Sequence, residues 1–251
     1  MNRIKFITVV FLLVCSTSAW AQKDYKASMF GIKSDGTTLN TGSIQKAVDY
    51  ISENGGGRLV FYVGRYLTGT INLKSNVTIQ LEEGAGLMAS TSTYDYDFVN
   101  GNAALIIAKD QQNVGVTGKG LIDGQGISIN ANIDEQTRKN NLPTGQTSFR
   151  PLLICMDNCT NVTLSDILMY NAGGDVQAYS GCKNIEAKNI TVKSKILPST
   201  KGIVLTGCSG VQLADSFVDV SSVPFSLKGA ASKDVKVQNS VTADGRKIQP
   251  K

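Results

Sequence analysis

A short repeated pattern constrains this chain more than any other feature of its sequence. A bend residue (Asn, Asp or Gly) is followed by an aliphatic–x–aliphatic stretch, and internal repeats of this kind indicate stacked architectures. The first aliphatic positions are spaced by 37, 48, 23, 26 and 24 residues, and they are Val77, Val114, Val162, Ile185, Val211 and Val235. Each unit of about two dozen residues also holds two further β-prone stretches. Three short strands per unit predict a β-solenoid whose units stack as rungs.

Cysteine placement supports the same register. Cys159, Cys182 and Cys208 each lie three residues before an aliphatic position of the repeat. Stacked strands are about 4.8 Å apart, so we expect these side chains to form a ladder along the solenoid. A ladder of buried free thiols is the favoured interpretation. A disulfide within the ladder is the alternative, and a metal site is less favoured still.

Two segments depart from the repeat. Ile44, Ala47, Val48 and Ile51 follow the spacing of an amphipathic helix, which would cap the exposed first rung. Residues 127–149 are rich in Asn, Thr, Gly and charge, and we expect them to form a loop. No comparable helix is predicted at the C-terminal end, so a protein partner could cover the last rung there.

The N-terminal segment has the order of a secretory signal peptide. A basic stub precedes an apolar run from Phe6 to Val14, and Ala19-Trp20-Ala21 follows as a cleavage site. We therefore expect a signal peptide over residues 1–21, a domain over residues 22–251, and a secreted or periplasmic location. Cys15 lies in a poor context for lipidation, and the apolar run is shorter than the ~20 residues that span a bilayer. No membrane association is predicted.

Charge and composition exclude several classes of function. The formal net charge of +5 includes two cations of the signal peptide, so the remaining domain carries 5 − 2 = +3. This charge is not gathered into a Lys/Arg stripe, which argues against nucleic acid but is compatible with a polyanionic sugar. The chain has no histidine, which excludes a Ser-His-Asp triad and histidine-containing metal sites. No metal or other cofactor is predicted.

Several segments resemble the polygalacturonases of glycoside hydrolase family 28. The opening at residues 30–36 and 55–57 is shared with pectate-lyase-like and tailspike proteins, whereas the segments at 66–71 and 118–126 and the pair Arg150-Pro151 are more specific. The resemblance covers about two thirds of a usual family member. It implies an all-β fold, a single right-handed parallel β-helix, and pectic or other acidic polysaccharide as the partner.

The resemblance also implies where catalytic carboxylates should stand. Family members hydrolyse with inversion, for which an acid and a base sit about 6.5–9.5 Å apart, and their first aspartate lies seven residues before the ladder cysteine. That position is Lys201 here, and Ser222 and Val223 stand where the next rung should carry an aspartate pair. The family's His-Gly and Arg-x-Lys elements are also missing. General acid–base assistance contributes about 10²–10⁴-fold per role, so we predict a noncatalytic or very weak hydrolase homologue.

The remaining acids and lysines define a candidate binding site. Asp175 lies seven residues before Cys182, so it should stack one rung below Lys201. These two residues, with Lys228, are the candidate substrate-binding residues. The alternative is that Asp175 and Lys201 form a surface ion pair, which contributes about 0–1 kcal/mol. Asp219 could pair with Asp175 in a relocated catalytic mechanism.

Other side chains have both a functional and a structural interpretation. Asp123 could be an acid but in the family belongs to a turn, which is the favoured interpretation. Tyr94, Tyr96 and Tyr170 could stack on sugar rings or simply pack. Two classes of function stay open: a polysaccharide-associated protein, either noncatalytic or an active hydrolase with relocated carboxylates, and a structural or protein-interaction solenoid.

Overall fold

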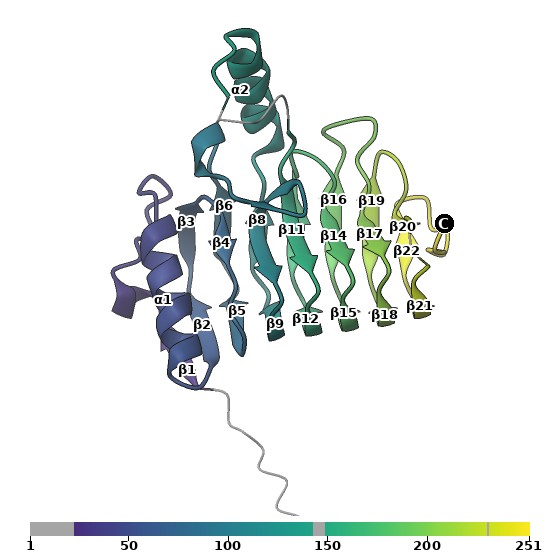
Figure 1. Ribbon diagram of the computed structural model, residues 1–251, viewed down its shortest axis with the longest axis horizontal. Helices are drawn as coiled ribbons and strands as arrows, with labels where there is room; N and C mark the ends of the chain where they lie inside the picture. Colours follow the sequence, from purple (N-terminus) through teal and green to yellow (C-terminus); the bar gives the residue numbers. More distant parts are fainter. Residues whose placement is uncertain (1–22, 143–148, 230) are drawn as a thin grey trace, which may run out of the picture.

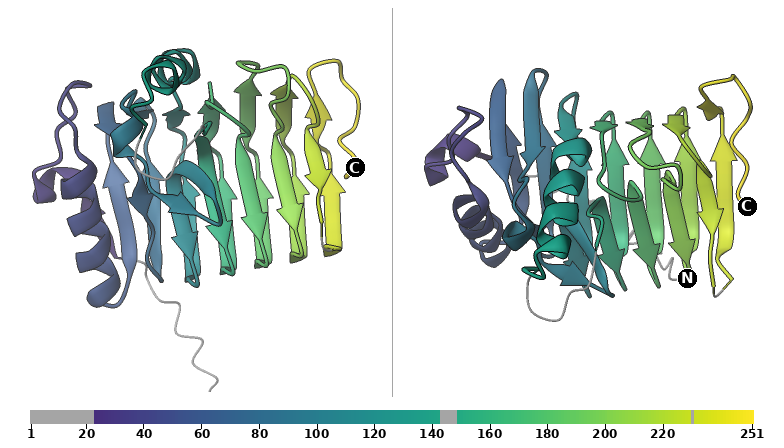
Figure 2. Two further views of the ribbon diagram at one scale, coloured as in Figure 1. Left: turned by 45° about the horizontal axis from the view of Figure 1, so that its top comes forward. Right: turned by 90° about the horizontal axis from the view of Figure 1, so that it is seen from above.

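Three parallel β-sheets wind around one core in the computed structural model, which describes residues 23–142, 149–229 and 231–251. The predicted signal peptide lies outside the described residues. Figures 1 and 2 show the strands stacked as successive rungs along the long axis of the molecule. The coil is a right-handed parallel β-helix, as predicted.

A complete rung contributes one strand to each of the three sheets, and the first and last rungs are incomplete. Sheet A contains β1 (Asp24–Lys26), β2 (Gly57–Phe61), β5 (Val77–Leu81), β9 (Gln112–Thr117), β12 (Thr160–Ser165), β15 (Lys183–Lys188), β18 (Ser209–Ala214) and β21 (Lys233–Gln238). Sheet B contains β3 (Gly64–Thr68), β6 (Ala85–Ala89), β10 (Leu121–Asp123), β13 (Leu168–Tyr170), β16 (Thr191–Ser194), β19 (Phe217–Val220) and β22 (Val241–Thr242). Sheet C contains β4 (Ile71–Asn72), β8 (Asn102–Lys109), β11 (Leu152–Asp157), β14 (Gln177–Ser180), β17 (Ile203–Thr206) and β20 (Phe225–Leu227).

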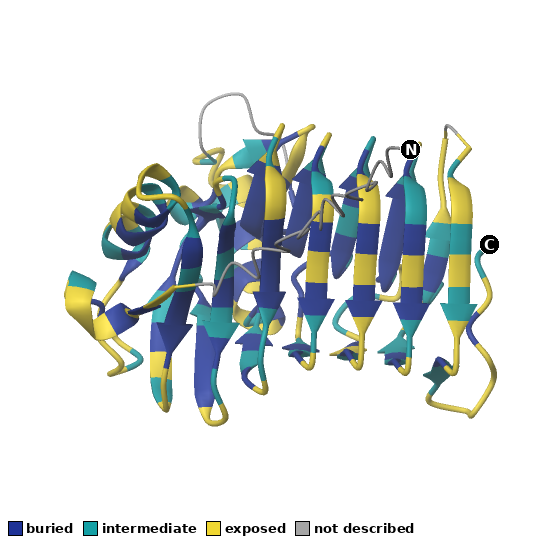
Figure 3. Ribbon diagram, turned by 90° about the horizontal axis from the view of Figure 1, so that it is seen from below, coloured by how far each residue is buried: buried dark blue, intermediate teal, exposed yellow. Residues whose placement is uncertain are grey.

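The predicted register of the repeat is confirmed. Val114, Val162, Ile185, Val211 and Val235 are successive partners in sheet A. The first four are buried, whereas Val235 on the last strand is half-buried. Figure 3 shows buried and exposed residues alternating along the strands. This alternation follows from the two-residue period of a β-strand, which sends every second side chain into the core.

Side-chain amides stabilise the bends between sheets. Asn76, Asn113, Asn161 and Asn184 have φ between 55° and 65°, a left-handed conformation that asparagine tolerates. The amides of Asn113, Asn161 and Asn184 each donate to the side-chain oxygen of the asparagine on the preceding rung, at 2.7, 2.8 and 3.0 Å. The stacked amides satisfy one another's polar groups along the edge of the coil.

The cysteine ladder lies inside the coil. Cys159, Cys182 and Cys208 are buried free thiols on consecutive rungs, because the residues that follow them pair in sheet A. The Cys182 sulfur lies 3.4 Å from the backbone nitrogen of Cys159. The predicted stacking is therefore confirmed.

The N-terminal end is capped as expected. Helix α1 (Thr41–Glu53) packs Ile44, Ala47, Val48 and Ile51 fully buried against the first rungs. A short 3-10 helix, η1 (Ala27–Phe30), lies beside it. At the other end, β20, β21 and β22 are the last strands of their sheets within the described residues. The proposal of a protein partner at this end stays a prediction.

The expectation of a loop over residues 127–149 is wrong for its first half. Residues Gly126–Arg138 form helix α2, which stands over the edge of the coil (Figure 1). Ile129 and Ile133 face a separate apolar cluster that contains Tyr96 and Phe149. The helix is largely polar, and Gln125 at its N-cap makes no side-chain capping hydrogen bond. Its stability therefore depends on packing against the apolar cluster. No helix in the described part is long and apolar enough to cross a membrane.

Candidate functional site

A cleft runs along the outer face of sheet C. Its floor is a column of small and apolar side chains, since strand pairing aligns Ile107, Cys155, Ala178, Val204 and Ser226 on successive rungs. Cys155 is buried, and burial raises the pKa of its thiol to about 12. A protonated thiol packs as a small apolar group, so the floor is apolar and uncharged.

One rim of the cleft is formed by the residues that precede the strands of sheet C. Asp175 and Lys201 are neighbours, because the Val176 backbone N–H donates to the Lys201 carbonyl at 2.9 Å. The Lys201 backbone N–H donates in turn to the Asp175 carboxylate at 2.8 Å. Val223 follows on the next rung, where its carbonyl accepts from the Gly202 N–H at 3.0 Å. The sequence thus placed these residues on the correct rungs.

The other rim follows the strands of sheet C. Ser180 and Thr206 pair on adjacent rungs, and the Lys228 backbone N–H continues the ladder by donating to the Leu205 carbonyl at 2.8 Å. The hollow between the two rims has a volume of about 360 Å³ and is lined by Asn100, Asn102, Leu152, Cys155, Met156, Asp175, Ala178, Tyr179, Ser180, Val204, Thr206, Lys228 and Gly229. Asp175 and Lys228 therefore share one cleft.

A hairpin closes the N-terminal end of this cleft. Strand β7 (Phe98–Val99) pairs antiparallel with β8 and crosses in front of sheet C (Figure 1). Val99 belongs to the same apolar cluster as Leu152 and Cys155. The Asn100 amide donates to the Asp157 carboxylate at 3.1 Å. The hairpin is consequently fixed to the floor and forms an end wall.

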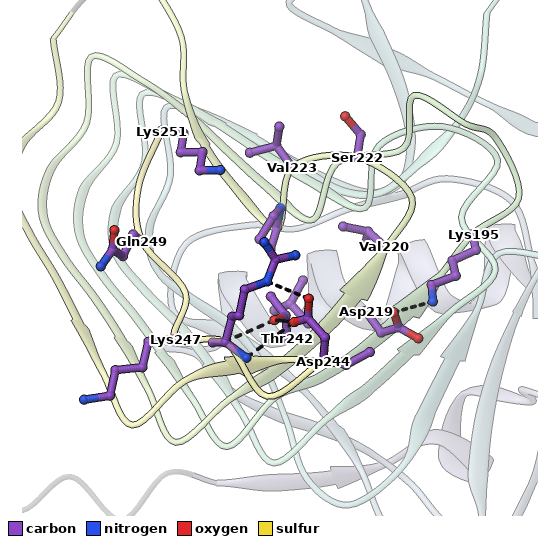
Figure 4. Close-up of a pocket in the computed structure, with 14 residues that line it drawn as sticks. Lys195, Asp219, Val220, Ser222, Val223, Thr242, Asp244, Lys247, Gln249 and Lys251 are labelled. Atoms are coloured by element: carbon purple, nitrogen blue, oxygen red, sulfur yellow. Dashed lines mark hydrogen bonds and ion pairs between the residues drawn. The ribbon is translucent and has the colours of Figure 1, made fainter.

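Asp219, Ser222 and Val223 line a different pocket near the last rung, with a volume of about 620 Å³ (Figure 4). The Asp219 carboxylate forms an ion pair with Lys195 at 2.6 Å. A second acid in this pocket, Asp244, has a lowered pKa because the Thr242 hydroxyl donates to it. The structure therefore puts Asp175 and Asp219, the predicted relocated pair, in separate pockets.

The ion pair between the side chains of Asp175 and Lys201, the structural alternative for these two residues, is not among the ion pairs of the described residues. The Asp175 carboxylate accepts from the Lys201 backbone instead. Lys201 and Lys228 consequently take part in no ion pair within the described part of the chain. Of these two cations, Lys228 is among the residues that line the cleft.

Asp123 and the tyrosines predicted as candidate sugar contacts have places within the fold. The Asp123 carboxylate accepts from the Gln125 backbone N–H at 2.9 Å, as expected for a turn. Tyr96 is buried and its hydroxyl donates to the Ser90 carbonyl, so it cannot stack on a sugar. Tyr94 is exposed, and its hydroxyl donates to the Asn141 carbonyl at 2.9 Å. Tyr170 is half-buried on sheet B, away from the cleft.

Sequence reasoning missed the floor and the end wall of the cleft. The floor residues belong to the expected strands, but nothing in their order shows which face a hairpin will cover. From the sequence alone, Arg150 is only part of the family-like pair Arg150-Pro151. Its guanidinium forms an ion pair with Asp134 of α2, which ties the helix to the segment that precedes β11. No group of three or more His, Cys, Asp or Glu side chains able to hold a metal ion occurs in the described residues.

The fold and the cleft define a class: a right-handed parallel β-helix with a groove along one sheet. The sequence profile of glycosyl hydrolases family 28 matches residues 60–248, and the chain belongs to this family. It is 34% identical over 140 residues to an exo-poly-alpha-D-galacturonosidase of Dickeya chrysanthemi, a match that covers 49% of this chain and 23% of that protein. It is 27% identical to an exopolygalacturonase of Zea mays, over 92% of this chain and 58% of that protein.

Solved structures agree with this assignment. A putative glycosyl hydrolase from Parabacteroides merdae shares 44% identity with a TM-score of 0.83, and the match covers 90% of this chain and 99% of that one. The hyperthermoactive exopolygalacturonase from Thermotoga maritima has a TM-score of 0.76 at 20% identity, covering 88% of this chain and 60% of that one, which shows the fold alone. The chain spans less than two thirds of the curated relatives it matches.

Proposed function

We propose that this protein binds an acidic, pectin-type polysaccharide in the cleft over sheet C and does not hydrolyse it. The carboxylate content of the cleft carries the proposal. Asp175 is the single carboxylate among the thirteen described residues that line it. Inverting hydrolysis needs two carboxyl groups, a general acid and a general base. One carboxylate, already held by a backbone N–H, does not supply both.

The charges around the cleft favour an anionic ligand. Lys228 lines one rim of the cleft, and Lys201 follows the lining residue Asp175 on the next rung at the other rim. Neither lysine has an ion-pair partner among the described residues. Hydrogen bonds from a cation to a carboxylate are roughly twice as strong as neutral ones. The apolar floor between the rims suits the C–H face of a sugar ring, since ligand sites combine apolar surface with a few polar groups. A uronate chain presents both chemistries together.

The relatives support the class of ligand. Several curated relatives are named polygalacturonases or exopolygalacturonases, and galacturonan is the polymer in those names. The predicted signal peptide supports an encounter outside the cytoplasm, where such polymers occur. The end wall formed by residues 98–102 supports entry of a chain end rather than passage of a chain interior.

Two measurements on the mature protein test the proposal. In affinity electrophoresis, polygalacturonate in the gel should retard the protein, whereas neutral glycans should not. Lys201→Gln and Lys228→Gln should each weaken binding about tenfold, the effect of one lost charged hydrogen bond. Lys183→Gln, the same change on sheet A, should leave binding unchanged and is the matched control.

Release of reducing ends from polygalacturonate should stay at background. Turnover by the unmodified protein that is lost in Asp175→Asn or Asp219→Asn would overturn the noncatalytic assignment. Equal affinity of the two cleft variants and the control would overturn the assignment of the binding site.

A further inference from the structure

The outer face of sheet B lies on a different side of the coil from the cleft. Strand pairing aligns two outward columns there. The first contains Arg65, Gly86, Leu121, Leu168, Thr191 and Phe217, and the second contains Leu67, Met88, Asp123, Tyr170, Lys193 and Asp219. Their apolar members are half-buried, so this sheet exposes apolar surface along several rungs.

The columns enclose a hollow at the N-terminal end of this face. Gly86 contributes no side chain at its outward position, which leaves a space between Arg65 and Leu121. The hollow has a volume of about 340 Å³. Met88, Leu121 and Leu168 line it with apolar surface, and Arg65 and Lys119 supply its cations.

The cations that line the hollow have no ion-pair partners in the described residues, whereas its carboxylate accepts hydrogen bonds. Arg65 and Lys119 take part in no ion pair among the described residues. The carboxylate of Asp123 is already occupied, because it accepts from the Gln125 N–H at 2.9 Å and from the Asn171 amide at 3.3 Å. The hollow therefore presents two free cations beside an apolar floor.

The same combination recurs farther along the face. Lys193 lies 5.9 Å from the ring centroid of Phe217, and Tyr170 is on the preceding rung. The carboxylate of Asp219, beside Lys193, is paired with Lys195. Cations thus lie beside apolar side chains at two places along the axis of the coil.

This pattern selects one class of occupant. Strands β6, β10, β13 and β16 are each paired on both sides, so no free edge is available for an added peptide strand. A chain of pyranose rings with one carboxylate per ring offers apolar ring faces and regularly spaced anions. Arginine suits such carboxylates because its planar fork binds them through two hydrogen bonds.

We propose that the outer face of sheet B is a second site for an acidic polysaccharide, with Arg65 and Lys119 binding carboxylates and Met88, Leu121 and Leu168 contacting ring faces. This site goes beyond the proposed function of the cleft, and each of the two proposals can be disproved without affecting the other. One protein would then hold two segments of polymer on separate faces.

Calorimetric titration with a short oligogalacturonate tests the proposal, because a short ligand fills each site separately. The unmodified protein should bind two oligomers per chain. Arg65→Gln/Lys119→Gln should bind one, and Lys201→Gln/Lys228→Gln, in the cleft, should also bind one. Lys183→Gln/Lys188→Gln on sheet A makes the same charge change and should still bind two. Circular dichroism melts check that each variant is folded.

A second variant separates ring contact from charge alone. Leu121→Ser/Leu168→Ser keeps both cations and should weaken the sheet B site at least about tenfold, since it removes apolar contact surface. Unchanged stoichiometry and affinity in both sheet B variants would overturn the second site and leave the cleft proposal intact. If the sheet B variants lost all binding and the cleft variant lost none, the result would support the sheet B site and overturn the proposal of binding in the cleft.

Discussion

The backbone N–H of Lys201 donates a 2.8 Å hydrogen bond to the carboxylate of Asp175 on the rung below. This hydrogen bond joins two rungs at the rim of the cleft. The side chain of Lys201 takes no part in it. This relationship gives the acid a structural role and leaves the cation for a ligand.

Replacing Asp175 tests this division of roles. Asp175→Ala removes a charged acceptor of a backbone N–H, and we expect a loss of about 1–3 kcal/mol in the free energy of unfolding. Asp175→Asn retains an oxygen acceptor and should lose less. Lys201→Gln should change stability little, because the donor is the backbone. Urea denaturation measures all three, and equal losses for Ala and Asn would contradict the role of the acceptor.

Restoring the missing carboxylates should not restore hydrolysis. In Lys201→Asp/Ser222→Asp/Val223→Asp the new acid at position 201 would lie beside Asp175, and like charges raise a carboxyl pKa. The variant would also lose the Lys201 cation, and electrostatic positioning is commonly the larger part of catalysis. We expect reducing-end release within about tenfold of background. Rapid turnover by the triple variant would show that the carboxylates alone were missing.

The thiols of Cys155, Cys159, Cys182 and Cys208 should all be free in solution. Denatured but unreduced mature protein should titrate four thiols, and two or fewer would reveal a disulfide between rungs. In the native state, alkylation of Cys155 at pH 8 should be slow. Burial raises the pKa of Cys155 to about 12, so at pH 8 its reactive thiolate is scarce as well as inaccessible.

The asparagine ladder should be sensitive to the type of substitution. Asn161 has φ of 57°, donates to Asn113 and accepts from Asn184. Asn161→Ala loses both hydrogen bonds and strains the left-handed backbone, at a cost of about 1–2 kcal/mol for the strain alone. Asn161→Gly loses the same bonds without that strain and should be the more stable of the two. Thermal melts of the two variants give the comparison.

The repeat by itself determined the coil. A bend residue and an aliphatic pair recurring at Val162, Ile185 and Val211 leave one stacking that buries every pair, because strand side chains alternate between two faces. The same register placed Asp175 below Lys201 and Val223 above it, and predicted that the cysteines stack. The N-terminal helix was equally predictable, since its apolar spacing matches one helical face.

The tertiary structure alone decided what lies on top of the coil. Helix α2 is stabilised by Tyr96 and Phe149, which are distant in the sequence, and a polar segment carries no local signal of such contacts. The hairpin at β7 closes the cleft because Val99 packs on Cys155, a contact that strand periodicity does not encode. Asp175 and Asp219 occupy separate pockets for the same reason: the repeat sets which rung and face a residue occupies, but the walls between pockets come from segments outside the repeat.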